Sequence, residues 1–276
     1  MPSQLYCGVM GVIHVAYFTD PACPWSWAAE PALRRLQVEF GDQARITYVM
    51  GGLAREFPRP LGELPDLLNA MASTGMPGDP RVWLDRPPAS SYPACQGVKA
   101  AAEQRLDGPY LRVLREGFMV ERRALDTGPA LIDAARTVDG MDVARFELDL
   151  RSHATAEAFA ADLDRVRGTA PEQHGDSGRV PFPSFEVRGE DGSVHGVWGD
   201  HEPAALRAAA IAAGATPGPL PSVEEAVRRF RRIATAEVAA VCDLPRPRAA
   251  AELWRLAGDW RIRHEPVLAG ELWSAA

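Results

Sequence analysis

The sequence predicts an α/β fold in which a long all-helical subdomain interrupts one sheet and a helical tail follows it. Two β-type segments, at residues 12–19 and 45–50, flank a helical pattern near the start. Helical periodicity then dominates residues 58–170, and β-type sequence returns at 180–187 and 194–198. An insertion between two halves of the same sheet accounts for this order.

Length, charge and cysteine content limit the classes of function that are expected for this chain. With 276 residues, of which 46% are hydrophobic, the chain is long enough for one large domain or two smaller ones. Its net charge of −7 gives no global positive field, so neither a nucleic-acid nor a membrane partner is expected. No basic leader and no apolar run of roughly 18 residues are found, so we expect a cytoplasmic protein. Four cysteines are too few for a disulfide framework.

The first half of the predicted sheet is a β-α-β unit. Val12 to Thr19 reads as a buried strand that ends at Asp20-Pro21. Pro24 suits the first position of a following helix, and Pro31 should kink or restart that helix. Arg45 to Met50 then forms the second strand, which places Cys23 at the corner between strand and helix.

The insertion and the second half of the sheet follow. Apolar spacing predicts helices in the insertion at 61–73, 96–104, 109–121, 129–138 and 154–166. A turn at Glu190-Asp191-Gly192 then joins the two later strands into a hairpin, and the segment "HEPAALRAAAIAAG" closes this half with a helix.

A proline-rich linker, Ala215 to Ser222, separates the C-terminal tail, which contains three helical pieces and a short hairpin in "WRIRHEPVLAGELW". Helices flanking Asp243-Leu244-Pro245 allow a helix-turn-helix or winged-helix-like arrangement. We favour a helical cap whose arginines, at 228, 229, 231 and 232, form a solvated basic face. The expected boundaries are 11–57 and 175–214 for the two sheet halves, 58–174 for the insertion and 215–276 for linker and tail.

Cys23 is the main candidate for chemistry. A cysteine at a helix N-terminus lies near unpaired N–H groups and the positive end of the helix dipole, which lower the thiol pKa from about 8.5 and make a nucleophilic thiolate. The alternative is a buried, inert cysteine.

The segment "VPFPSFEV" supplies a second candidate feature. Pro183 interrupts a predicted strand, where an ordinary proline removes a ladder hydrogen bond. A cis peptide between Phe182 and Pro183, at the turn into the strand, explains its place, with Pro181 as the other candidate.

These features resemble the DsbA superfamily of thioredoxin-fold proteins, in which a helix-start cysteine faces a cis-proline loop. By this resemblance Cys23 is the nucleophile, Ser26 occupies the resolving position and Pro183 is the cis-proline. Within the superfamily, "DPACPWSWAAEP", "SSYPACQGVKAA", "HATAEAFAADL" and "AEVAAVCDL" resemble SpxH/YjbH-type proteins, adaptors that present a redox regulator to the ClpXP protease. The resemblance implies a thioredoxin-like fold with an inserted helical subdomain.

The chain departs from that pattern at Ser26. Net dithiol oxidation needs a second thiol to resolve the mixed disulfide, and Ser26 cannot do so. Its hydroxyl can still donate a hydrogen bond to the Cys23 thiolate. We therefore expect a poor DsbA-type oxidase, unless Cys95 moves in from the insertion; otherwise Cys95 and Cys7 are expected to be structural.

Two reactions remain for a single thiolate. It can exchange with glutathione or a protein thiol through a mixed disulfide, or add reversibly to a conjugated double bond and isomerise it, as the similar glutathione-linked hydroxychromene carboxylate isomerases suggest. A small-molecule pocket near Cys23 would be lined by Phe18, Trp25, Trp27, Tyr92 and Phe182, whose alternative role is core packing.

The leading hypothesis is therefore a thiol-dependent oxidoreductase or isomerase, and the alternative is a non-catalytic protein-binding adaptor. The histidines show no metal-ligand spacing, so no metal is expected and glutathione is the one cofactor considered. Asp20 lies close to Cys23 in sequence and either raises its pKa, transfers protons or shapes the turn before Pro21. The oligomeric state is left open.

Overall fold

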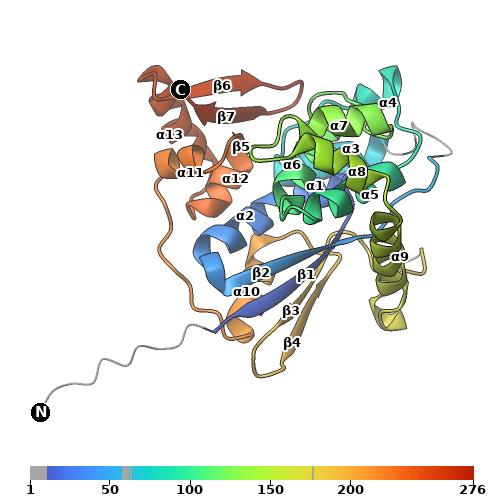
Figure 1. Cartoon of the computed structure of the whole chain (residues 1–276). Helices are drawn as coiled ribbons and strands as arrows, with labels where there is room; N and C mark the ends of the chain where they lie inside the picture. The colour runs from blue at the N-terminus through green and yellow to red at the C-terminus, as the bar shows by residue number, and fades with distance from the viewer. Residues whose placement is uncertain (1–10, 58–61, 63, 176) are drawn as a thin grey trace, which may run out of the picture.

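A mixed four-stranded sheet forms the centre of the computed structural model (Figure 1). Its strand order is β2-β1-β3-β4. β1 (Ile13–Thr19) runs parallel to β2 (Ala44–Met50) and antiparallel to β3 (Ser184–Arg188), which pairs antiparallel with β4 (Val194–Trp198). One sheet thus joins two distant parts of the chain, as the sequence predicts. The structure describes residues 11–57, 62, 64–175 and 177–276.

β3 begins later than the sequence suggests. Strand pairing was expected from Val180, but it starts at Ser184, directly after the cis Phe182–Pro183 bond. Pro181 and Pro183 have no N–H to donate to a ladder, so the chain before Ser184 forms a loop at the sheet edge.

Three helices complete the two sheet halves: α1 (Pro24–Ala28), α2 (Glu30–Glu39) and α10 (Pro203–Ala212). The predicted interruption is confirmed, because α1 ends before Ala29 and Pro31 stands in the first turn of α2, where its missing N–H costs nothing. A short 3₁₀ turn, η1 (Gly41–Gln43), leads from α2 into β2.

The insertion between β2 and β3 is helical, as expected. Its helices are α3 (Leu64–Thr74), α4 (Val82–Asp85), α5 (Tyr92–Ala102), α6 (Asp107–Met119), α7 (Gly128–Ala135), α8 (Val143–Leu150) and α9 (His153–Arg167), followed by η3 (Pro171–Gln173). α4 and α8 were not predicted. α8 buries only Phe146, so its apolar spacing is weak, and the expected helix start at Leu61 lies outside the described residues.

The tail contains α11 (Val223–Arg229), β5 (Ile233–Ala234), α12 (Thr235–Val241), α13 (Arg246–Gly258), β6 (Ile262–Pro266) and β7 (Glu271–Ala275). The predicted hairpin is confirmed as β6 and β7, and β5 completes a sheet of order β5-β7-β6. Three helices and a small antiparallel sheet in this order make a winged-helix-like unit.

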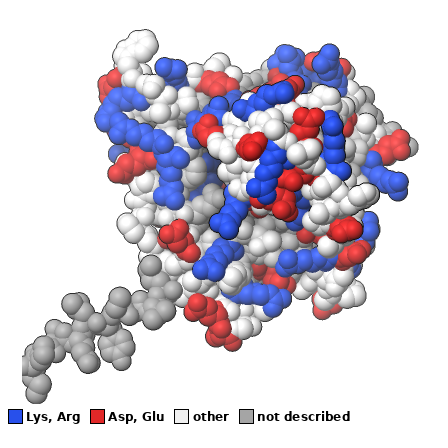
Figure 2. Space-filling model, viewed as in Figure 1, with Lys and Arg blue, Asp and Glu red and all other residues white. Residues whose placement is uncertain are grey.

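Apolar packing joins these parts. One large buried cluster includes Tyr17 and Phe185, whose rings stack at 4.4 Å across the sheet, together with side chains from the insertion. The tail has its own cluster around Trp273, and a third surrounds Cys23. Among the described residues, the helices are all too short or too polar to cross a membrane. On the face that Figure 2 shows, cationic and acidic side chains are intermixed.

Candidate functional site

Cys23 lies at the predicted corner between strand and helix. It is the N-cap residue of α1, with extended backbone angles, and its Sγ accepts a hydrogen bond from the backbone N–H of Ser26 at 3.4 Å. The sequence folds this way because Asp20-Pro21 ends β1 and Pro24 is preorganised for the first helical turn.

The cis-proline faces this cysteine. The Phe182–Pro183 peptide bond is cis, as predicted, and the Phe182 carbonyl oxygen lies 3.8 Å from Cys23 Sγ, where it accepts a weak S–H hydrogen bond. The two features therefore meet across 159 residues of sequence, at the end of β1 and the start of β3.

The pKa of Cys23 shifts in the direction opposite to the one predicted. Cys23 is only 3% exposed, and this burial raises the pKa of its thiol above the ordinary value. Hydrogen bonding from Ser26 lowers the pKa by less, and the nearby Asp20 carboxylate raises it further. α1 has five residues, so its dipole is too small to offset the loss of solvation. Burial thus favours the neutral thiol form of Cys23 in this structure.

Ser26 acts through its backbone more than through its side chain. The Ser26 hydroxyl is buried and makes no hydrogen bond of normal geometry within the described residues, although its proximity to Sγ moderates the thiol pKa. Its carbonyl oxygen accepts from the Tyr17 hydroxyl at 3.3 Å. Ser26 therefore stabilises the corner without resolving a disulfide.

Asp20 organises the loops behind Cys23. One carboxylate oxygen accepts from Ala22 N–H at 2.8 Å, which confirms the turn-shaping role, and the other accepts from Leu53 N–H, Ser91 Oγ and Cys95 Sγ. Burial raises the pKa of Asp20 and raises that of Cys95 well above its ordinary value. Cys95 is fully buried, which agrees with a structural role, while Cys7 lies outside the described residues.

The aromatic residues predicted to line one pocket divide between two places. Phe18, Phe182 and Trp25 pack in the cluster that contains Cys23. Trp27 belongs instead to the large core cluster, fully buried, with its Nε1 donating to the Pro77 carbonyl at 2.8 Å. Tyr92 packs edge-on against Phe159 at the border of that core. The prediction that Trp27 lines a pocket beside Cys23 is therefore wrong.

Arg179 is a site residue that sequence reasoning missed. Its guanidinium lies 4.2 Å from the centroid of the Phe182 ring and donates to the Leu53 carbonyl at 3.4 Å. Burial lowers the pKa of Arg179, and the charges of Asp20 and Cys23 oppose that change. A single arginine in a glycine-rich loop gives no periodic signal. Within the described ranges, no group of three or more potential ligands is placed to hold a metal ion.

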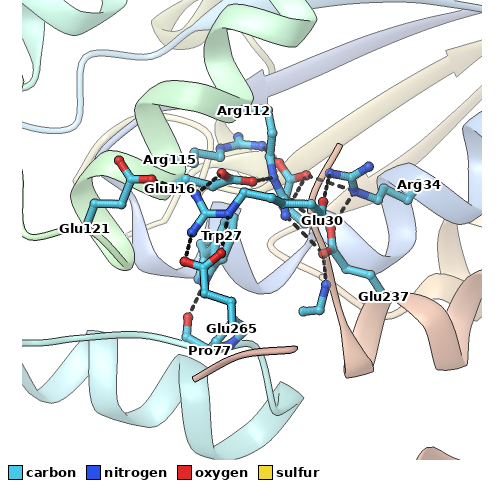
Figure 3. Close-up of polar contacts among 12 residues, drawn as sticks. Trp27, Glu30, Arg34, Pro77, Arg112, Arg115, Glu116, Glu121, Glu237 and Glu265 are labelled. Atoms are coloured by element: carbon cyan, nitrogen blue, oxygen red, sulfur yellow. Dashed lines mark hydrogen bonds and ion pairs between the residues drawn. The ribbon is translucent and has the colours of Figure 1, made fainter. Parts of the chain in front are cut away.

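A second cluster, which we call the ionic junction, lies where α2, α6 and the tail meet (Figure 3). Glu237 of α12 accepts from Arg34 of α2 at 2.6 Å and from Arg112 of α6 at 2.6 Å, and its side chain is fully buried. Glu30 accepts from Arg112 and Arg115 on its other side. The ionic junction fastens the tail to both other parts of the molecule.

Three of the four arginines predicted to form a solvated basic face are exposed, and Arg232 is the exception. Arg232 has a side chain only 16% exposed, and it pairs with Glu116, Glu121 and Glu265. The four tail arginines therefore differ in role, because Arg228 pairs locally with Glu224 at the surface. Sequence periodicity gave no indication of partners so distant along the chain.

Comparison with other proteins extends the picture. A family model described as Thioredoxin matches residues 17–168. The chain is 30% identical to the ClpXP adapter protein SpxH of Halalkalibacterium halodurans, covering 95% of this chain and 88% of the relative. It is 27% identical to the same protein of Bacillus subtilis, covering 95% and 89%. Since the tail is over a fifth of the chain, these matches include the tail.

Solved structures share the fold. A putative protein disulfide isomerase from Nitrosomonas europaea superposes with a TM-score of 0.59 at 20% identity, over 73% of this chain and 97% of the other. The cytosolic disulfide reductase DsbM from Pseudomonas aeruginosa superposes with a TM-score of 0.56 at 21% identity, over 71% and 95%. Both likenesses concern the fold alone.

Proposed function

Because the chain belongs to the thioredoxin-fold family that includes the ClpXP adapter protein SpxH, we propose that it is a protein-binding adaptor that delivers a bound protein to a ClpXP-type protease. The observation that carries the proposal is the ionic junction, which holds the tail in a fixed place through the buried Glu237 carboxylate. Thiol chemistry at Cys23 does not need a docked tail, whereas presentation of a bound protein needs two surfaces in a fixed relation.

The state of Cys23 supports the same proposal. A thiol that is 3% exposed, with a pKa raised by burial, attacks a disulfide slowly because the thiolate is the reactive form. Ser26 supplies no resolving thiol. The corner at Cys23 and Pro183 is therefore better suited to shape a protein-binding surface than to turn over a substrate. An adaptor of this kind works with its protease in the cytoplasm.

Protein half-lives in a deletion strain test the proposal. Removing the gene should lengthen the half-life of at least one cellular protein severalfold, and the difference should vanish when ClpP is also inactivated. The wild-type gene and Cys23→Ala should both restore the short half-life. Glu237→Gln should fail to restore it, because the tail loses its buried anchor, whereas Glu252→Gln on the tail surface should restore it.

The same strains separate the two classes of function. If Cys23→Ala behaves like the deletion while Glu237→Gln behaves like the wild type, thiol chemistry is the function and the adaptor proposal fails. If no protein changes its half-life in a ClpP-dependent way, the proposal fails as well.

A second candidate is monothiol exchange, which the hydrogen bond from the Ser26 N–H to Cys23 Sγ favours. The Cys23 thiolate would attack one sulfur of glutathione disulfide, form a mixed disulfide and release the second glutathione as its thiolate. Isomerisation of a conjugated small molecule has less support, because Trp27 packs in the large core cluster and not in the cluster around Cys23.

A further inference from the structure

A cleft lies away from the Cys23 corner, beside α2 and α6. It has a volume of about 400 Å³ and lies beside the ionic junction, between α2, α6 and the tail segment 229–232. Its apolar walls include Leu33, Pro109, Val138 and Phe230. A volume of this size is within the range of small-molecule sites, which combine apolar walls with a few polar groups.

The charges at this cleft are mainly positive. Six arginines but only three carboxylates line it. Four of the arginines, at 34, 112, 115 and 232, are neutralised within the ionic junction. Arg229 has no carboxylate partner among the described residues and donates to the Gln37 carbonyl at 3.4 Å. Arg231 donates to the Thr137 carbonyl, and its nearest carboxylate is that of the fully exposed Asp139, at 4.0 Å. Uncompensated positive charge therefore remains at the mouth.

A buried donor without a partner lines the cleft. Arg115 is fully buried and leaves its Nε–H without an acceptor among the described residues. Buried donors are normally satisfied, so this one is suited to an acceptor atom that a ligand brings.

Gly108 keeps this space open. A Cβ at position 108 would lie 2.8 Å from the Tyr48 hydroxyl oxygen, closer than atoms in contact allow. A larger residue here would have to displace Tyr48 or project into the cleft. The absence of a side chain at Gly108 is therefore a condition for the cavity.

We propose that this cleft binds a small amphipathic monoanion, an aliphatic or aromatic carboxylate or sulfonate. Its apolar body lies against Leu33, Val138 and Phe230, and Arg229 and Arg231 attract its charge. Because the lining comes from α2, α6 and the tail, a bound molecule touches all three parts of the chain. The proposal is independent of the adaptor function.

Fluorescence titration of the full-length protein with anilinonaphthalene sulfonate tests the site. We expect a saturable, blue-shifted signal with one equivalent bound. Octanoate should displace this probe, and octanol, which has the same chain without the charge, should need at least a tenfold higher concentration. The double variant R229Q/R231Q should weaken octanoate binding at least fivefold.

The matched control is R228Q/R248Q, which changes the net charge equally at two tail arginines outside the cleft lining. It should bind octanoate within twofold of the wild type. Gly108→Leu should abolish the signal, with Gly128→Leu, at an open surface position, as its control. If Gly108→Leu does not fold, the comparison of R229Q/R231Q with R228Q/R248Q tests the proposal by itself. Equal affinities of R229Q/R231Q and the wild type, or equal displacement by octanol and octanoate, overturn the proposal.

Discussion

Arg34 Nε donates a 2.6 Å hydrogen bond to the Glu237 carboxylate although 203 residues separate them. The Glu237 side chain is fully buried and also accepts from Arg112 and from the backbone N–H of Ala234, at the start of α12. One carboxylate thus caps a tail helix and joins the tail to α2 and α6. The position of the tail depends on charges from three parts of the chain.

Glu237→Gln should lower the free energy of unfolding by about 3 kcal/mol, because removing one partner of a buried ion pair leaves the other charges uncompensated. Urea denaturation followed by circular dichroism measures the loss. Glu252→Gln removes a carboxylate that pairs with Arg255 on the α13 surface, and it should cost less than about 1 kcal/mol. Equal losses in the two variants would show that the junction adds no stability.

Alkylation of Cys23 should be slow at neutral pH. Burial raises the pKa of this thiol, so its rate with iodoacetamide should keep rising above pH 9 and stay below that of a peptide of residues 19–27. Asp20→Asn should increase the rate, since the Asp20 charge raises the Cys23 pKa. Mass spectrometry of the labelled peptide gives the rates, with exposed Asp191→Asn as the control. An alkylation rate that levels off below pH 8 would show that the Cys23 pKa is not raised and would support the predicted thiolate.

Ionisation of Glu30 should make the free energy of unfolding depend on pH in the acidic range. Burial opposes its ionisation, but Arg112, Arg115 and Arg34 together lower the Glu30 pKa from 4.5 to about 2. Since the folded-state pKa is the lower one, this stabilisation is complete above the unfolded value and is lost as the pH falls from about 4.5 to about 2. The shift corresponds to about 3 kcal/mol.

Comparison with Glu30→Gln isolates that contribution. The difference in unfolding free energy between wild type and variant should be largest at pH 5 and shrink as the pH approaches 3, as urea titrations at each pH will measure. A constant difference across this range would mean that Glu30 titrates normally in the folded protein.

Trp27→Phe should destabilise the protein by about 2 kcal/mol, because it leaves the Pro77 carbonyl without its donor and opens space in the core. The alkylation rate of Cys23 should stay within twofold of the wild type, since Trp27 packs in another cluster. Trp260→Phe, at an 88% exposed position, controls for stability and should be neutral. If the alkylation rate of Cys23 changes severalfold in a folded Trp27→Phe variant, Trp27 does contribute to the site at Cys23.

The sequence by itself determined the local features of this protein. Alternation and helical spacing predicted the four strands of the main sheet, the insertion and the tail hairpin, since these patterns depend on which faces are buried. Pro24, Pro31 and Pro183 fixed a helix start, a helix break and a cis peptide bond, because proline restricts its own backbone. The corner at Cys23 follows from the same neighbours.

The tertiary structure alone decided the electrostatics. Whether Cys23 ionises depends on how deeply the Phe182 loop and Asp20 bury it, and burial comes from segments far apart in sequence. Trp27 packs in the core because its partner, Pro77, comes from a distant segment. The ion pairs of Glu30, Arg115 and Glu237 likewise form only where three parts of the chain pack together. Solvation and charge pairing act through space, so a pattern read along one chain does not contain them.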